Sequence, residues 1–88
     1  MGKVLVRLKV LPIDAETKPN EVLESVQKSL PSNMEVKRVI EDPIAFGLTA
    51  SIIDFLIEEK DGEMDRLEKA LKLSDLVSQI EVIGISRF

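Results

Sequence analysis

The order in which hydrophobic periodicity changes along the chain constrains its fold more than any other feature. Residues 3–11 alternate between apolar and polar side chains, which predicts a half-buried strand that Pro12 ends. Residues 19–30 carry apolar side chains at helical spacing, and Pro19 and Pro31 suit the start and the end of a helix. Residues 34–41 alternate again, but Arg38 and Val39 break the pattern, which predicts a strand with a mostly polar outer face or one at an edge of the sheet.

The second half of the chain repeats this order without a clear sequence repeat. Residues 48–57 are the most apolar segment and alternate little, so we expect a central strand. Asp54 interrupts that segment, and no partner for its charge can be read from the sequence. A second amphipathic helix follows Asp61, which we expect to cap it, with Glu63 and Asp65 in its first turn. Residues 77–88 hold the last predicted strand.

The resulting β-α-β-β-α-β order favours one architecture. Each helix has a single apolar face and needs the sheet to cover it. Right-handed crossovers and a hairpin between the middle strands then predict an α+β, ferredoxin-like βαββαβ sandwich. We expect a four-stranded antiparallel sheet with both helices on one face, and the other face open to solvent or to another molecule. A length of 88 residues fits one domain, spanning 1–88.

Composition excludes several classes of function. The chain has no His and no Cys, so the usual general base and the strongest nucleophile are missing, and 88 residues build no deep pocket. We therefore expect no enzyme and no cofactor. The net charge of −4 disfavours nucleic acid as a partner. No apolar run approaches the ~20 residues of a membrane span, so we expect no membrane partner. The absence of Cys is compatible with a reducing cytosol, and Arg7 and Lys9 interrupt the first apolar run, so we expect no signal peptide and a cytoplasmic location.

A cluster of acidic residues precedes and begins the second predicted helix. Its spacing does not match a calcium-binding loop, and acids are expected in the first turn of a helix. We therefore predict a structural role and no metal site for Glu58, Glu59, Asp61, Glu63 and Asp65.

The strongest candidate for a binding site is the predicted loop between the second and third strands. Pro43 removes a backbone donor, and Gly47 permits a positive φ, so the chain turns here. Ile44 and Phe46 lie between them. Apolar residues in a surface loop either fold back onto the core or face a partner. The residues alone leave both readings open.

Three segments together resemble a known family, archaeal translation elongation factor 1-beta. They are Asp42-Pro43-Ile44-Ala45-Phe46-Gly47-Leu48, Asp61-Gly62 before the second helix, and the ending Arg87-Phe88. The resemblance covers essentially the whole chain. It implies a ferredoxin-like fold and a single guanine-nucleotide exchange domain over residues 1–88. It also implies that the partner is elongation factor 1-alpha, a GTPase, and that the protein takes part in translation elongation.

The resemblance further implies which residues bind the partner. Phe46 matches a loop Phe that inserts into a pocket of the GTPase. Arg87 matches a penultimate basic residue, a Lys in eukaryotic members, whose side chain reaches the Mg²⁺ and phosphate region. Phe88 matches the apolar residue beside it. The implied partner-binding residues are Pro43, Ile44, Phe46, Gly47, Arg87 and Phe88. We expect Phe46 to be exposed and to lie close enough to Arg87 for both to meet one partner.

Two alternative functions remain open for this fold. A small-ligand regulatory module would carry a Gly-rich loop and form a dimer. The chain has no glycine cluster, and we expect a monomer when free. An RNA-binding sheet would carry paired aromatic residues among basic ones, and the candidate strands offer only Phe55.

Overall fold

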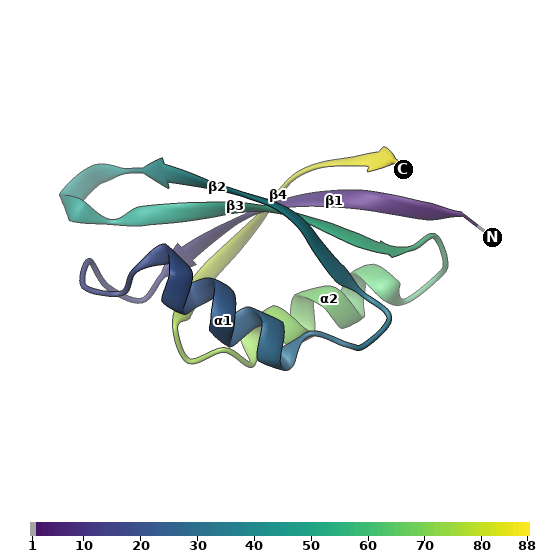
Figure 1. Cartoon of the computed structure of the whole chain (residues 1–88), viewed down its shortest axis with the longest axis horizontal. Coiled ribbons are helices and arrows are strands. Elements are labelled where there is room, and N and C mark those ends of the chain that lie inside the picture. The colour runs from purple at the N-terminus through teal and green to yellow at the C-terminus, as the bar shows by residue number, and fades with distance from the viewer. Residues whose placement is uncertain (1) are drawn as a thin grey trace.

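The computed structural model describes residues 2–88, which form one sheet and two helices (Figure 1). The strands are β1 (Lys3–Pro12), β2 (Glu35–Pro43), β3 (Thr49–Glu58) and β4 (Val77–Arg87), and the helices are α1 (Pro19–Ser29) and α2 (Glu63–Lys72). All strand pairs are antiparallel, in the order β2-β3-β1-β4. Both helices lie on one face of the sheet (Figure 1). The predicted ferredoxin-like α+β arrangement is confirmed, with β2 at an edge and β3 in the interior of the sheet.

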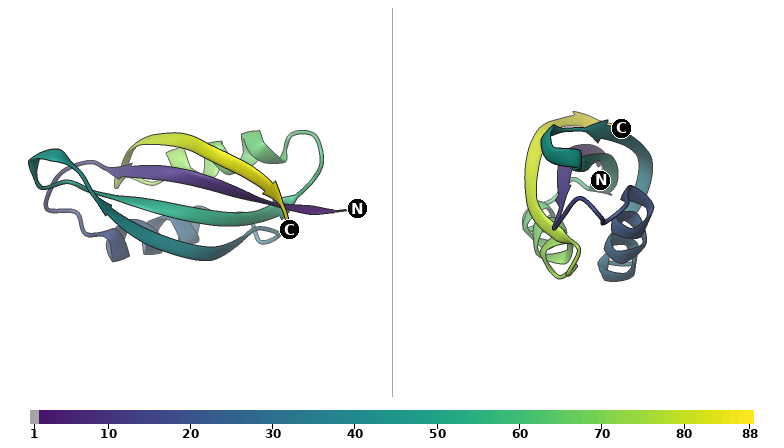
Figure 2. Two further views of the ribbon diagram at one scale, coloured as in Figure 1. Left: turned by 90° about the horizontal axis from the view of Figure 1, so that it is seen from above. Right: turned by 90° about the vertical axis from the view of Figure 1, so that its left-hand side faces the viewer.

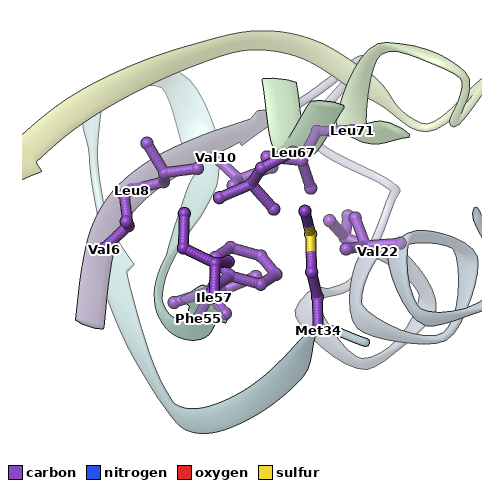
Figure 3. Packing of buried hydrophobic residues seen from close by; sticks show 11 residues of the cluster. Val6, Leu8, Val10, Val22, Met34, Phe55, Ile57, Leu67 and Leu71 are labelled. Atoms are coloured by element: carbon purple, nitrogen blue, oxygen red, sulfur yellow. The ribbon is translucent and has the colours of Figure 1, made fainter. Parts of the chain in front are cut away.

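The hydrophobic core lies between the sheet and the two helices. Alternate residues of β1 and β3 face the helices, and both helices bury apolar side chains against them (Figure 3). Each fully buried Val, Leu, Ile or Phe stabilises the fold by about 1.5–3 kcal/mol. The fully buried core includes Val6, Leu8, Val10, Ile53, Phe55, Leu67 and Leu71. Phe55 is therefore covered by the helices, and the aromatic side chain that the RNA-binding alternative needed does not face the open side of the sheet.

Asp54 has its partner on the neighbouring strand. Asp54 on β3 lies directly opposite Arg7 on β1, on the face away from the helices. Its carboxylate accepts hydrogen bonds from Nε (2.7 Å) and Nη2 (3.0 Å) of Arg7. These hydrogen bonds and the positive charge of Arg7 lower the pKa of Asp54, although its burial at 8% exposure opposes the shift. The pair therefore links the two central strands.

The start of α2 differs from the prediction that Asp61 caps the helix. Gly62 occupies the N-cap position in the left-handed region (φ 87°), and no side chain caps the helix there. The chain reverses sharply between β3 and α2, and glycine takes this conformation without a steric penalty. The adjacent Glu63 is buried, and its carboxylate accepts hydrogen bonds from Arg66 (2.7 Å) and Asn33 (3.0 Å), which lower its pKa. Glu63 thus has a structural role, as predicted.

Candidate functional site

The first candidate surface is the hairpin tip, residues 43–48, between β2 and β3. β2 extends to Pro43, two residues further than predicted, because a strand at the edge of a sheet tolerates a missing donor. The N–H of Ile44 donates to the carbonyl of Leu48 (2.8 Å), and the N–H of Leu48 donates to the carbonyl of Ala45 (3.3 Å). These hydrogen bonds close a tight turn, and Phe46 lies at its exposed apex.

Phe46 stands at the apex of this turn and is 94% exposed. Its backbone adopts the left-handed region (φ 62°, ψ 30°), which costs a residue with a side chain about 1–2 kcal/mol. Gly47 follows with φ 78°, the positive value predicted for it. The reading in which Phe46 folds back onto the core is therefore wrong. The hairpin tip holds an aromatic ring in solvent on an unfavourable backbone conformation.

The second candidate surface is the tail pair, Arg87 and Phe88, at the end of β4. Arg87 pairs with Val4 where β4 runs beside β1, and the N–H of Phe88 donates to the carbonyl of Lys3 (3.2 Å). The backbone of the tail pair is thus fixed, while the side chain of Arg87 is 82% exposed and Phe88 is 72% exposed. Nη1 of Arg87 donates to Oε1 of Glu59 at 3.3 Å.

A residue that the sequence analysis did not select also contacts the tail pair. Nζ of Lys37 on β2 lies 5.7 Å from the centroid of the Phe88 ring. β2 and β4 are the two outer strands, so this contact requires the sheet to curl. The end-on view in Figure 2 shows both outer strands rising on the side away from the helices and approaching each other. The only sequence sign of this arrangement is the interrupted alternation at Arg38 and Val39, which marks a register shift.

The hairpin tip and the tail pair lie at opposite ends of the sheet (Figure 1). β3 and β4 both run antiparallel to β1, so they run in the same direction. The hairpin tip precedes β3, whereas the tail pair ends β4. At about 3.3 Å per residue, the ten residues of β3 span roughly 30 Å. The expectation that Phe46 and Arg87 lie close together is therefore wrong, and the two side chains cannot enter the same pocket.

Two further properties of residues 2–88 concern metal binding and the membrane. No group of three or more acidic side chains is arranged to hold a metal ion in this part of the chain. Neither helix in the same range has the length and hydrophobicity needed to cross a membrane.

A solved structure with a similar fold is the C-terminal domain of the MgtC protein from Mycobacterium tuberculosis. It superposes with a TM-score of 0.61 over 99% of this chain and 88% of that chain. The two sequences are only 12% identical, so the likeness concerns the fold alone.

Sequence comparison gives a more specific result. The family model of the EF-1 guanine nucleotide exchange domain matches residues 5–88. Elongation factor 1-beta of Thermofilum pendens is 40% identical over 89 residues, covering 100% of this chain and 98% of the relative. The factor of Staphylothermus marinus is 42% identical over 88 residues, which cover 99% of this chain and 98% of the relative. The factor of Thermoplasma acidophilum is 30% identical over 86 residues, covering 98% of each. The chain therefore belongs to the elongation factor 1-beta family, and its residues 5–88 match the EF-1 guanine nucleotide exchange domain.

Proposed function

We propose that this chain is a guanine-nucleotide exchange factor that promotes the release of GDP from elongation factor 1-alpha. The family match over residues 5–88 and the relatives named elongation factor 1-beta support this assignment. The structural observation that carries the binding mechanism is the exposed ring of Phe46 on a left-handed backbone. Residues 1–88 act as one exchange domain in this proposal.

The proposed activity rests on reciprocal coupling between two binding equilibria. A GTPase holds GDP through Mg²⁺ and a phosphate-binding loop. Suppose that a protein binds the nucleotide-free GTPase more tightly than the GDP-bound form. It then weakens the binding of GDP by the same factor by which GDP weakens its own binding to the GTPase. A thousandfold acceleration of release requires about 4 kcal/mol at the release barrier. No covalent bond is made or broken in the exchange factor, so it needs no catalytic residue and is not an enzyme.

Phe46 supplies the anchor at the hairpin tip. An aromatic side chain that becomes buried at a protein interface contributes roughly 2–4 kcal/mol when it is a hot spot. Phe46 has nearly its whole ring surface available for burial, because 94% of the residue is exposed. Its neighbours Ile44 and Pro43 extend the apolar surface of the hairpin tip. Insertion of Phe46 into a pocket of the partner would supply a large part of the required coupling energy.

Arg87 supplies a positive charge at the other end of the sheet. Its guanidinium presents a planar fork of donors that matches phosphate oxygens, and its charge competes with a cation for the same anionic groups. The hydrogen bond to Glu59 is no obstacle, because the Arg87 side chain is 82% exposed and exposed ion pairs contribute only ~0–1 kcal/mol. In this proposal Arg87 perturbs the Mg²⁺ and phosphate region of the GTPase.

The separation of roughly 30 Å along β3 changes how these two contacts act together. Phe46 and Arg87 engage two separate regions of the partner and are joined by a rigid antiparallel sheet. The sheet fixes the position of one contact relative to the other, because its central strands pair without a register shift from Lys3 to Val10 and are also joined by Arg7 and Asp54.

The proposal is tested by replacing Phe46 with Ala and measuring the release of labelled GDP from elongation factor 1-alpha. We expect release in the presence of Phe46→Ala to fall at least tenfold, because the loss of a hot-spot anchor costs about 2 kcal/mol or more. Leu73→Ala is the matched control: Leu73 is 72% exposed and lies in the helix layer after α2. Equal stimulation by Phe46→Ala and by the unaltered chain would show that the hairpin tip is not the anchor.

A further inference from the structure

We propose that Lys37 is a positioning residue for nucleotide exchange, which holds the ring of Phe88 and thereby orders the tail pair before the partner binds. The inference rests on the proposed function, because it assigns Lys37 to the same partner-binding end. Lys37 does not need to contact the partner itself. Its role follows from the contacts that converge on the tail pair.

Two strands and the segment after β3 contribute contacts to the tail pair. The carbonyl of Lys3 on β1 fixes the backbone of Phe88, and Glu59, just after β3, holds the guanidinium of Arg87. Lys37 is the contact from β2, with its ammonium 5.7 Å from the ring centroid of Phe88. A positive charge at this distance from an aromatic ring is attracted by the ring face. Lys37 therefore joins the two outer strands across the open face.

The backbone of β2 places Lys37 for this contact. Val36 pairs with Phe55, and Arg38 pairs with Asp54, so Lys37 is the extra residue of a bulge in β2. Bulges redirect side chains and increase the local twist of a sheet. The ammonium of Lys37 is also held by the carboxylate of Glu35 at 3.0 Å. The bulge and this ion pair together direct Lys37 toward Phe88.

Ordering the tail pair in advance should act on binding and not on the maximal rate. The ends of protein chains are mobile unless they are tied down, and a side chain that is already ordered loses less freedom when it binds. Lys37→Met keeps a side chain of similar length and removes the charge. We expect it to raise the concentration for half-maximal GDP release about two- to fivefold, the scale of an exposed cation–ring contact, at an unchanged saturating rate.

Two other variants separate this role from a general charge effect. Lys37→Arg keeps a cation that binds an aromatic face, and we expect it to restore the half-maximal concentration. Lys28→Met removes a positive charge from an exposed position on α1, and we expect it to behave like the unaltered chain. A loss with Lys28→Met equal to that with Lys37→Met would overturn the inference, since net charge would then explain both.

A chain shortened to Ser86 distinguishes positioning from direct contact. In that background we expect Lys37→Met to have no further effect on exchange, because the side chain it positions is missing. An undiminished effect would show that Lys37 contacts the partner, and would overturn the inference. If shortening itself leaves exchange unchanged, the proposed role of the tail pair fails, and the inference fails with it. If shortening slows exchange but Lys37→Met does not, the inference alone fails.

The contact is also measurable without the partner. The chain contains three Phe and no Tyr, Trp or His, so its aromatic NMR signals are few and can be assigned. We expect a nuclear Overhauser effect between the ring protons of Phe88 and the side-chain methylene protons of Lys37 in the free protein. Absence of this signal, with the core signals of Phe55 intact, would overturn the inference whatever the exchange assay shows.

Discussion

At the scale of single residues, Phe46 combines two features that stability alone does not favour. Its ring is 94% exposed, and its backbone lies in the left-handed region that glycine adopts without penalty. The adjacent Gly47 also has a positive φ. The backbone of this turn would therefore accept a glycine at position 46. Strained conformations persist where the surrounding structure enforces them, and they cluster at functional sites. This combination supports the proposal that a partner uses the ring of Phe46.

We therefore expect that a substitution at position 46 can raise the stability of the protein while it removes the ring that the proposed function needs. Phe46→Gly removes the cost of the left-handed backbone conformation, but it also makes the unfolded chain more flexible, which offsets part of the gain. We expect the free energy of unfolding to rise by about 0.5–1 kcal/mol as the net result. Phe46→Ala retains a Cβ and should bring no such gain. Urea unfolding followed by circular dichroism measures both values. A Phe46→Gly variant that is less stable than Phe46→Ala would show that the backbone at this position is not strained.

The sequence predicted part of the candidate site at this scale. Pro43 and Gly47 mark the turn because their backbone limits are local, and the exposed ring of Phe46 was one of two readings left open. Lys37 and Glu59 were not predicted. Their contacts with the tail pair join segments far apart in the sequence, and the contact of Lys37 also depends on the curl of the sheet, which no local pattern encodes.

At the scale of elements, all four strands and both helices were predicted from hydrophobic patterning. Alternation or helical spacing marks most of them, and β3 is marked by a nearly continuous apolar run that is buried over most of its length. The differences lie at the ends of elements. β2 continues to Pro43, and the N-cap of α2 is Gly62 and not Asp61. These ends depend on how the chain turns between elements. The pairing of Arg7 with Asp54 likewise required the register of β1 against β3.

The pair of Arg7 on β1 and Asp54 on β3 should contribute to the stability of the protein in a pH-dependent way. The hydrogen bonds from Arg7 lower the pKa of Asp54 below the value of about 3.9 that applies in the unfolded chain. The folded state therefore gains stability from ionised Asp54 above that value, and loses it as the pH falls through the lower, folded-state pKa. Asp54→Asn should destabilise the protein at pH 7 by about 1.5–3 kcal/mol, the scale of hydrogen bonds to a charged group.

Urea unfolding of the unaltered chain and of Asp54→Asn at pH 7 and at pH 2.5 measures this effect. We expect the difference in free energy of unfolding between the two proteins to shrink at the lower pH. A difference that stays constant across this range would show that the charge of Asp54 does not stabilise the pair.

At the scale of the whole molecule, the relevant feature is the distance between its two candidate surfaces. The longest extent of the molecule is 42 Å, and the hairpin tip and the tail pair lie toward opposite ends of it. The expectation that they lie together came from the function implied for them, whereas the βαββαβ order already sets β3 and β4 in the same direction. In the proposed function the two surfaces therefore contact separate regions of the partner.

The most direct measurement is the rate at which labelled GDP leaves elongation factor 1-alpha, followed by stopped-flow fluorescence while this chain is added in increasing excess. We predict that release accelerates to a plateau on the order of a thousandfold above the spontaneous rate, equivalent to about 4 kcal/mol. GDP release that stays at its spontaneous rate at every concentration of the chain would contradict the proposed exchange activity.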